Sequence, residues 1–243
     1  MAKANEMVKA ARRGDIGTVT SLLKAGADPN IKNEYGETAL IIASSSGKRD
    51  IVELLLKASA DPNIKNKYGN TALMVASLSS SSKRDIIELL LERGADPNII
   101  DDDGQTALMW ASKYNIDVVD VVKLLLDNGA DPNIIDNNGF TASAIATYYK
   151  NRDVVDIVKF LKKHIATQAK IQATIQADKR LAVAKSRLLG SEESPLNLLD
   201  DTMQMMVGMV GKAKKRKKKR KKTRKSKKTR KSKKTRKRKS KKT

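Results

Sequence analysis

Two short motifs recur along the chain at one shared spacing. Gly-x-Thr-Ala occurs four times, with steps of 33, 35 and 35 residues, and its glycines are Gly36, Gly69, Gly104 and Gly139. Ala-Asp-Pro-Asn-Ile also occurs four times with the same steps, and its prolines are Pro29, Pro62, Pro97 and Pro132. Two landmarks that share one period of this length predict a solenoid of stacked repeats, in which each unit buries its apolar face on its neighbour.

Each complete unit predicts a pair of helices. In the unit that contains Gly69, Thr71 is placed to cap a short apolar helix, and Ile86 to Leu91 show the apolar spacing of a second helix. Residues 33–65, 66–100, 101–135 and 136–164 follow this plan. Residues 5–33 read as a half-matched first unit, which has two short helices and the closing motif but lacks the opening Gly-x-Thr turn, as expected for a terminal unit without a neighbour on one side. The pattern therefore predicts five helical units.

These motifs resemble the ankyrin repeat family. The family pattern is a turn with Gly, then Thr-Pro-Leu-His-x-Ala on a first helix, a Leu-Leu second helix and Gly-Ala-Asp-x-Asn. The resemblance implies an all-α solenoid of about five helix-turn-helix units with projecting β-turn fingers. The Asn-rich fingers and basic tail are also similar to those of ankyrin proteins from large DNA viruses or intracellular bacteria.

The chain departs from the family pattern at three kinds of position. Alanine replaces the family's proline at Ala39, Ala72, Ala107 and Ala142, and Ile41, Met74, Met109 and Ala144 replace its histidine. Ser59 stands where Gly26, Gly94 and Gly129 end their helices, and a left-handed conformation there costs a residue with a side chain about 1 kcal/mol. We therefore expect moderate stability, with a weak point near Ser59.

The boundaries that we expect are residues 1–164 for the ankyrin-repeat domain and 165–190 for a helical extension. Residues 191–211 read as a linker with a short Met-rich amphipathic helix, and residues 212–243 as a disordered tail. The extension reads as a long helix that ends at Gly190 and either extends or caps the last repeat, or else serves as a coiled-coil or partner-binding helix. The Met-rich helix either docks a partner or packs on this chain itself.

The charge of the chain is concentrated in the tail. Its 32 residues hold 24 Lys or Arg and no acidic residue, which leaves 26 basic and 27 acidic residues in the other 211. With so few apolar side chains the tail cannot fold by burial. Its clusters are typical of a nuclear or nucleolar targeting signal, of a nucleic-acid contact or of a patch that binds anionic membranes. The polyanion-binding or targeting residues that we select are Lys214, Lys215, Arg216, Lys217, Arg220, Arg224, Lys225, Arg230, Arg236 and Arg238.

The residues offer no constellation for catalysis. The sequence has no cysteine and one histidine, His164, which we place at the C-terminal end of the last repeat's helix. Asp101, Asp102 and Asp103 precede Gly104 but lack the spacing and the terminal Glu of a calcium loop. No signal peptide and no apolar run of about 18 residues is found. We expect a monomeric non-enzyme without cofactor, metal or membrane span.

The resemblance to ankyrin repeats implies a protein-binding surface made of the fingers and the exposed ends of the first helices. Transferred to this chain, the partner-binding residues are Glu34, Tyr35, Glu37, Lys67, Tyr68, Asn70, Asp102, Asp103, Gln105, Tyr114, Asn137, Asn138, Phe140, Tyr148 and Tyr149. Aromatic side chains favour interfaces, although packing between repeats would also account for them.

The sequence therefore predicts a protein-interaction scaffold whose tail directs it to the nucleus or nucleolus, with the cytoplasm as the other location, in a host cell if the protein is viral. Nucleic-acid binding through the tail is the alternative. A third possibility is that Asp101, Asp102 and Asp103 attract the tail and mask it.

Overall fold

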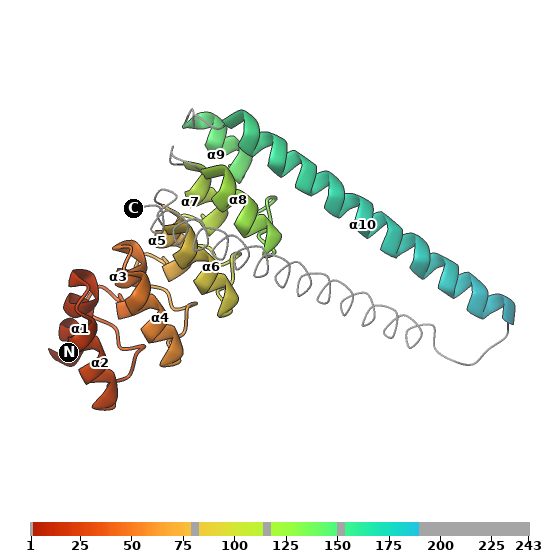
Figure 1. Cartoon of the computed structure of the whole chain (residues 1–243). Coiled ribbons are helices and arrows are strands. Elements are labelled where there is room, and N and C mark those ends of the chain that lie inside the picture. The colour runs from red at the N-terminus through yellow and green to blue at the C-terminus, as the bar shows by residue number, and fades with distance from the viewer. Residues whose placement is uncertain (1, 79–82, 114–117, 150–153, 190–243) are drawn as a thin grey trace, which may run out of the picture. The chain divides into compact units, whose positions relative to one another are not determined.

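The helices account for all the regular structure in the computed structural model, which describes residues 2–78, 83–113, 118–149 and 154–189 (Figure 1). Within these ranges there are ten helices and no β-strand, which confirms the all-α prediction. The helices are α1 (Ala2–Arg13), α2 (Ile16–Lys24), α3 (Ala39–Ser45), α4 (Arg49–Lys57), α5 (Ala72–Ser77), α6 (Arg84–Glu92), α7 (Ala107–Lys113), α8 (Val118–Asp127), α9 (Ala142–Tyr148) and α10 (Val154–Leu189).

The helices up to α9 stack in two parallel layers. One layer contains the first helices of successive units, and each of them packs on the next: α1, α3, α5, α7 and α9 (Figure 1). The other layer contains the second helices α2, α4, α6 and α8. Inside a unit the two helices also pack on each other. All of these helices lie in one compact unit, Met1–Ala169, and a second unit begins at Lys170.

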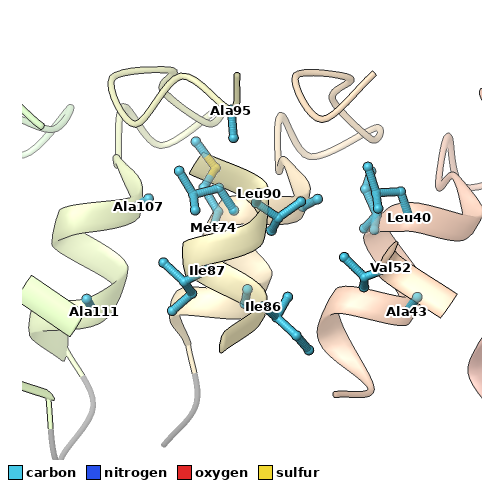
Figure 2. Close-up of a cluster of buried hydrophobic side chains, with 14 of the residues drawn as sticks. Leu40, Ala43, Val52, Met74, Ile86, Ile87, Leu90, Ala95, Ala107 and Ala111 are labelled. Carbon is cyan, nitrogen blue, oxygen red and sulfur yellow. The ribbon is translucent and has the colours of Figure 1, made fainter. Parts of the chain in front are cut away.

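Burial between units holds the stack together. Figure 2 shows buried side chains from both layers, from Leu40 and Val52 through Met74 and Ile87 to Ala111. In α3 all six residues from Ala39 to Ser44 are buried. Helices of six or seven residues are too short to form alone in water, so their stability comes from these contacts with neighbouring units.

The predicted threonine caps are present in all four complete units. Each threonine Oγ1 accepts a hydrogen bond from the backbone N three residues later, at 3.3 Å in Thr38 and 3.4 Å in Thr71, Thr106 and Thr141. This bond satisfies one of the amides that a helix N-terminus leaves without an intrahelical partner. The regular spacing of Gly-x-Thr-Ala in the sequence therefore marks the start of each first helix.

The Asp-Pro-Asn motif, which follows the second helix, joins one unit to the next. The asparagine Oδ1 accepts from the aspartate backbone N of the following unit, at 2.8 Å from Asn30 to Asp61, 2.8 Å from Asn63 to Asp96 and 2.7 Å from Asn98 to Asp131. The side-chain amides of Asn63 and Asn98 donate to the carbonyls of Gly94 and Gly129. The Ala-Asp-Pro-Asn-Ile motif therefore recurs because its asparagine forms a hydrogen bond with the next unit.

Ser59 has the left-handed backbone that we predicted for it. Its φ is 65°, and among the described residues it is the one non-glycine residue with a positive φ. The equivalent glycines Gly26, Gly94 and Gly129 have φ of 76°, 88° and 92°. The serine therefore carries a backbone strain that its three counterparts avoid.

Lys83 links two units across their inter-helix turns. Its Nζ donates to the carbonyl of Ser45 at the end of α3, where the helix dipole favours a cation. Burial lowers the pKa of the Lys83 ammonium. The Lys83 ammonium therefore caps the C-terminal end of α3.

The last helix agrees with our expectation at its end and differs from it at His164. The helix α10 runs without a break from Val154 to Leu189, as a long helix that extends the last repeat requires, so the placement of His164 at a helix end is wrong. The residues after His164 are mostly good helix formers and include no glycine or proline before Gly190, so nothing in the sequence stops the helix. Ile157 and Leu161 anchor its first turns in the core of the array. The linker, the Met-rich segment and the basic tail lie outside the described residues.

Candidate interaction surface

Four fingers precede the first helices, at residues 33–37, 66–70, 101–105 and 136–140. Each is closed by the side chain of its first residue. In the first finger the Oδ1 atom of Asn33 accepts from the backbone N of Tyr35 and of Glu37, both at 2.9 Å. Asn66, Asp101 and Asp136 make the same pair of bonds in the later fingers. We did not predict this turn-closing role for any of the four residues, although an Asn or Asp stands three residues before every Gly of Gly-x-Thr-Ala.

Backbone hydrogen bonds connect each finger to the next. The amide of Lys67 donates to the Tyr35 carbonyl at 3.1 Å, the amide of Asp102 to Tyr68 at 3.3 Å and the amide of Asn137 to Asp103 at 3.0 Å. The approach is close enough that a Cβ on Gly69 would lie 2.6 Å from the Asp102 backbone N. The four fingers therefore form one ladder that fixes the spacing of their tips.

Nine of the predicted partner-binding residues point into solvent along this ladder. The exposed ones are Glu34, Tyr35, Lys67, Tyr68, Asp102, Asp103, Asn137, Asn138 and Phe140. Glu37, Asn70 and Gln105 are half-buried instead, and the backbone N of each closes its turn. We call the exposed tips of the first three fingers, Glu34, Tyr35, Lys67, Tyr68, Asp102 and Asp103, the finger row.

The finger row contains two exposed tyrosines, Tyr35 and Tyr68. The Tyr35 side chain is 54% exposed and that of Tyr68 is 64% exposed. They occupy equivalent positions in adjacent fingers, whose backbones are bonded together. Large aromatic rings held on a rigid backbone lose little entropy when they are buried by a partner.

The finger carboxylates have no cationic partner within the part of the chain that the structure describes. Glu34, Asp102 and Asp103 form no ion pair there, and neither does Lys67. The charged residues of α4 behave differently, since Glu53 lies 3.1 Å from Arg49 and 2.9 Å from Lys57. The hydrogen bond from Lys57 and its charge lower the pKa of Glu53.

Two further predicted residues, Tyr148 and Tyr149, meet Phe140 at the last unit. The ring centroids of Phe140 and Tyr148 lie 5.8 Å apart in a stacked pair, and Tyr148 meets Tyr149 edge to face at 5.2 Å. The Nζ of Lys113 lies 5.1 Å from the centroid of Tyr149. Tyr148 remains 68% exposed, so the three rings form an accessible aromatic patch (Phe140, Tyr148 and Tyr149) on α9 and the fourth finger. Tyr114 lies outside the described residues.

Trp110 and Asp101 serve the fold. The Trp110 Nε1 donates to the Asp101 Oδ2 at 2.8 Å, while the Asp101 Oδ1 closes the third finger. Asp101 is only 6% exposed. Both of its oxygens are therefore engaged, which removes Asp101 from the set of three aspartates that we considered as an attractor for the tail.

Catalytic and metal-binding groups were also sought in the described residues. No group of three or more His, Cys, Asp or Glu in this part of the chain could hold a metal ion. His164 lies in α10, where its Nε2 is 3.4 Å from the Gln168 Nε2. A search of the same residues found no helix that is long and apolar enough to cross a membrane.

A stack of helix pairs with bonded fingers defines a helical repeat protein with a continuous recognition edge. A family model described as ankyrin repeats (3 copies) matches residues 7–101 and 78–174. Together these matches span more than half of the chain, and the protein belongs to the ankyrin repeat family. Ankyrin repeats are generally protein–protein interaction modules, and proteins built from them are typically non-enzymatic scaffolds. The search of curated proteins returned no match.

Proposed function

We propose that this protein is a non-enzymatic scaffold that binds a partner protein through the fingers and the exposed ends of the first helices. The observation that carries the proposal is the exposure of Tyr35 and Tyr68 on a hydrogen-bonded ladder of fingers. A monomer would suffice for this role, because every finger comes from one chain. The aromatic patch offers a second group of rings at the other end of the same edge.

Affinity capture with the double variant Tyr35→Ala, Tyr68→Ala tests this proposal. Truncating both rings removes exposed area and leaves the finger backbone in place, so we expect captured partner proteins to be lost while the fold is retained. A matched control is Ile100→Ala, Ile135→Ala, which removes two exposed apolar side chains outside the fingers. Equal capture by the wild type and the tyrosine variant would show that the partner binds elsewhere.

The tail suggests where this scaffold acts. Residues 212–243 carry 24 Lys or Arg with no acidic residue, a density that suits import into the nucleus or nucleolus, or retention on a polyanion there. The phosphorylatable residues Ser226, Thr229, Ser232, Thr235 and Ser240 lie among these bases, so added phosphates would weaken either contact. Fluorescently tagged full-length and 1–211 chains should differ in nuclear signal if the tail is a targeting element.

The same charge density favours a second candidate function, which is nucleic-acid binding without base specificity. Many lysines and arginines on phosphates release counterions, so the affinity should fall steeply as salt is raised. Truncation after Gly211 should abolish retention on RNA and DNA. Retention of nucleic acid by the truncated protein would rule out the tail as the binding element.

A further inference from the structure

The finger row has a chemical composition that goes beyond a generic protein-binding surface. Equivalent positions on the first three fingers carry Glu34 and Tyr35, Lys67 and Tyr68, and Asp102 and Asp103. Two exposed rings and three exposed carboxylates thus stand on adjacent fingers, with one lysine among them. The surface is negatively charged although the whole chain is strongly positive.

These carboxylates are available to a ligand. Within the described residues Glu34, Asp102 and Asp103 take part in no side-chain hydrogen bond or ion pair, whereas Glu53 on α4 is bonded by Arg49 and Lys57. An exposed carboxylate without a partner is solvated, and it gains most from a donor that makes two parallel hydrogen bonds. The three carboxylates of the finger row can therefore accept hydrogen bonds from a ligand.

The positions of these groups are fixed before any partner arrives. The amides of Lys67 and Asp102 bond to the carbonyls of Tyr35 and Tyr68, so the tips keep their spacing from finger to finger. The Asn33 and Asn66 side chains hold the turns that carry the two tyrosines. A preorganised row loses little conformational entropy on binding, which favours an extended ligand that crosses several fingers.

We propose that the finger row binds an extended, arginine-containing segment of the partner protein. Charge complementarity carries this choice, because a guanidinium pairs with a carboxylate through two hydrogen bonds and also stacks on the face of a tyrosine. A lysine ammonium is a more strongly hydrated point charge and gains less from both contacts. Lys67 opposes cations at the middle finger and so favours a segment whose basic residues flank that point. The proposal rests on the proposed function and names the chemistry of its partner.

Fluorescence anisotropy with three labelled dodecapeptides tests the proposal on the full-length protein. The peptides share one Gly-Ser framework and carry four arginines, four lysines or four uncharged glutamines. We expect the arginine peptide to bind about threefold or more tightly than the lysine peptide at physiological salt. The net charge of +23 repels both cationic peptides, so ratios between variants are the informative quantities.

The decisive variant neutralises the row with isosteric changes, Glu34→Gln, Asp102→Asn and Asp103→Asn. Its matched control makes the same change of charge on the outer helices, with Asp85→Asn, Glu88→Gln and Asp120→Asn, all at exposed positions. We expect about tenfold weaker arginine-peptide binding in the row variant and less than twofold in the control. Circular dichroism establishes that both variants are folded.

Two results would overturn the inference: equal binding by the row variant and the wild type, or an equal loss in the control. The capture experiment with Tyr35→Ala, Tyr68→Ala separates this failure from that of the proposed function. If captured proteins depend on the tyrosines while the peptide ignores the carboxylates, the surface is right and the arginine chemistry is wrong. If neither depends on the row, both proposals fail.

Discussion

Ser59 and Gly94 occupy the same place in successive units, and only the glycine suits the backbone found there. Both residues have a positive φ, 65° for Ser59 and 88° for Gly94. A Cβ in this region costs about 1–2 kcal/mol, of which part is recovered because glycine gains more freedom in the unfolded chain. Ser59 and Gly94 therefore allow the cost of a side chain at this backbone conformation to be measured in both directions within one protein.

Exchanging these residues tests the strain directly. We expect Ser59→Gly to raise the free energy of unfolding by about 0.5–1 kcal/mol and Gly94→Ser to lower it by a similar amount. Urea denaturation followed by circular dichroism measures both. No gain from Ser59→Gly would mean that the serine is not strained at this position.

The Asp at the base of the third finger has a role that Asn at the first two fingers does not have. Asp101 accepts from Trp110 as well as from its own finger, whereas Ile42 and Val75 occupy the position of Trp110 in the earlier units. An asparagine amide would present a donor to the indole N–H and leave it unsatisfied. The carboxylate of Asp101 thus supplies the acceptor that the Trp110 indole requires.

Asp101→Asn should cost about 1–3 kcal/mol of folding free energy because it leaves a part-buried donor without an acceptor. Asp136→Asn is the control, since its second partner is the Gln105 amide at 3.4 Å, which can rotate to offer its oxygen. Unfolding followed by the fluorescence of the one tryptophan measures the first change, and circular dichroism measures both. Equal costs for the two variants would contradict this account.

At the scale of elements, a positive φ accounts for the glycine that begins every Gly-x-Thr-Ala, and the close approach of the next finger adds a second reason at Gly36, Gly69 and Gly104. Gly69 and Gly139 both have a positive φ, but a Cβ on Gly69 would lie 2.6 Å from the Asp102 backbone N, whereas one on Gly139 meets nothing within 4 Å. Only the first of these glycines has a finger stacked beyond it. We therefore expect the same substitution to be more destabilising at Gly69 than at Gly139.

We expect Gly69→Ala to destabilise the protein by at least about 1 kcal/mol more than Gly139→Ala, because the backbone of the next finger must move. The shared cost of a positive φ cancels in this comparison. Chemical denaturation of both variants gives the difference. If the two alanines cost the same, the fingers are not held as tightly as the bonds between them indicate.

The second helix of the first unit carries a pH-dependent cap. The hydrogen bonds from the Thr18 side chain and backbone hold the pKa of Asp15 below its ordinary value of 3.8. A depressed carboxyl pKa contributes stability at higher pH that is lost as the pH falls through the folded-state pKa. We expect Asp15→Asn to reduce the loss of unfolding free energy below about pH 4. Chemical denaturation at several pH values measures this dependence. If the unfolding free energy of the variant falls with pH as steeply as that of the wild type, the proposed role of the cap is contradicted.

At the scale of the whole molecule, the period in the sequence was sufficient to predict the stacked helix pairs and the places where they begin. It succeeded because Thr38 and its counterparts cap helices locally and because apolar spacing records burial. It failed at His164, where a helix continues because no local residue stops it. A repeat pattern marks the units that repeat and gives little information on the segments beyond the last unit.

The candidate site was predictable only in part, since exposure depends on neighbouring units. The sequence placed Tyr35 and Tyr68 correctly in solvent, but it also counted Asn70 as a tip residue, and the structure shows Asn70 half-buried with its backbone N bonded to Asn66. The contacts among Phe140, Tyr148 and Tyr149 join residues of a finger and a helix end, and helical spacing alone does not reveal them. Their use in binding stays a prediction.

The central claim is that the array, and not the basic tail, holds the partner protein. Affinity capture with the full-length chain and with residues 1–211, each with and without nuclease, tests it most directly. The account predicts one set of proteins that is captured by both chains and resists nuclease, while further proteins disappear with the tail or the nucleic acid. If every captured protein is lost on truncation or on nuclease treatment, the tail is the binding element and the claim is contradicted.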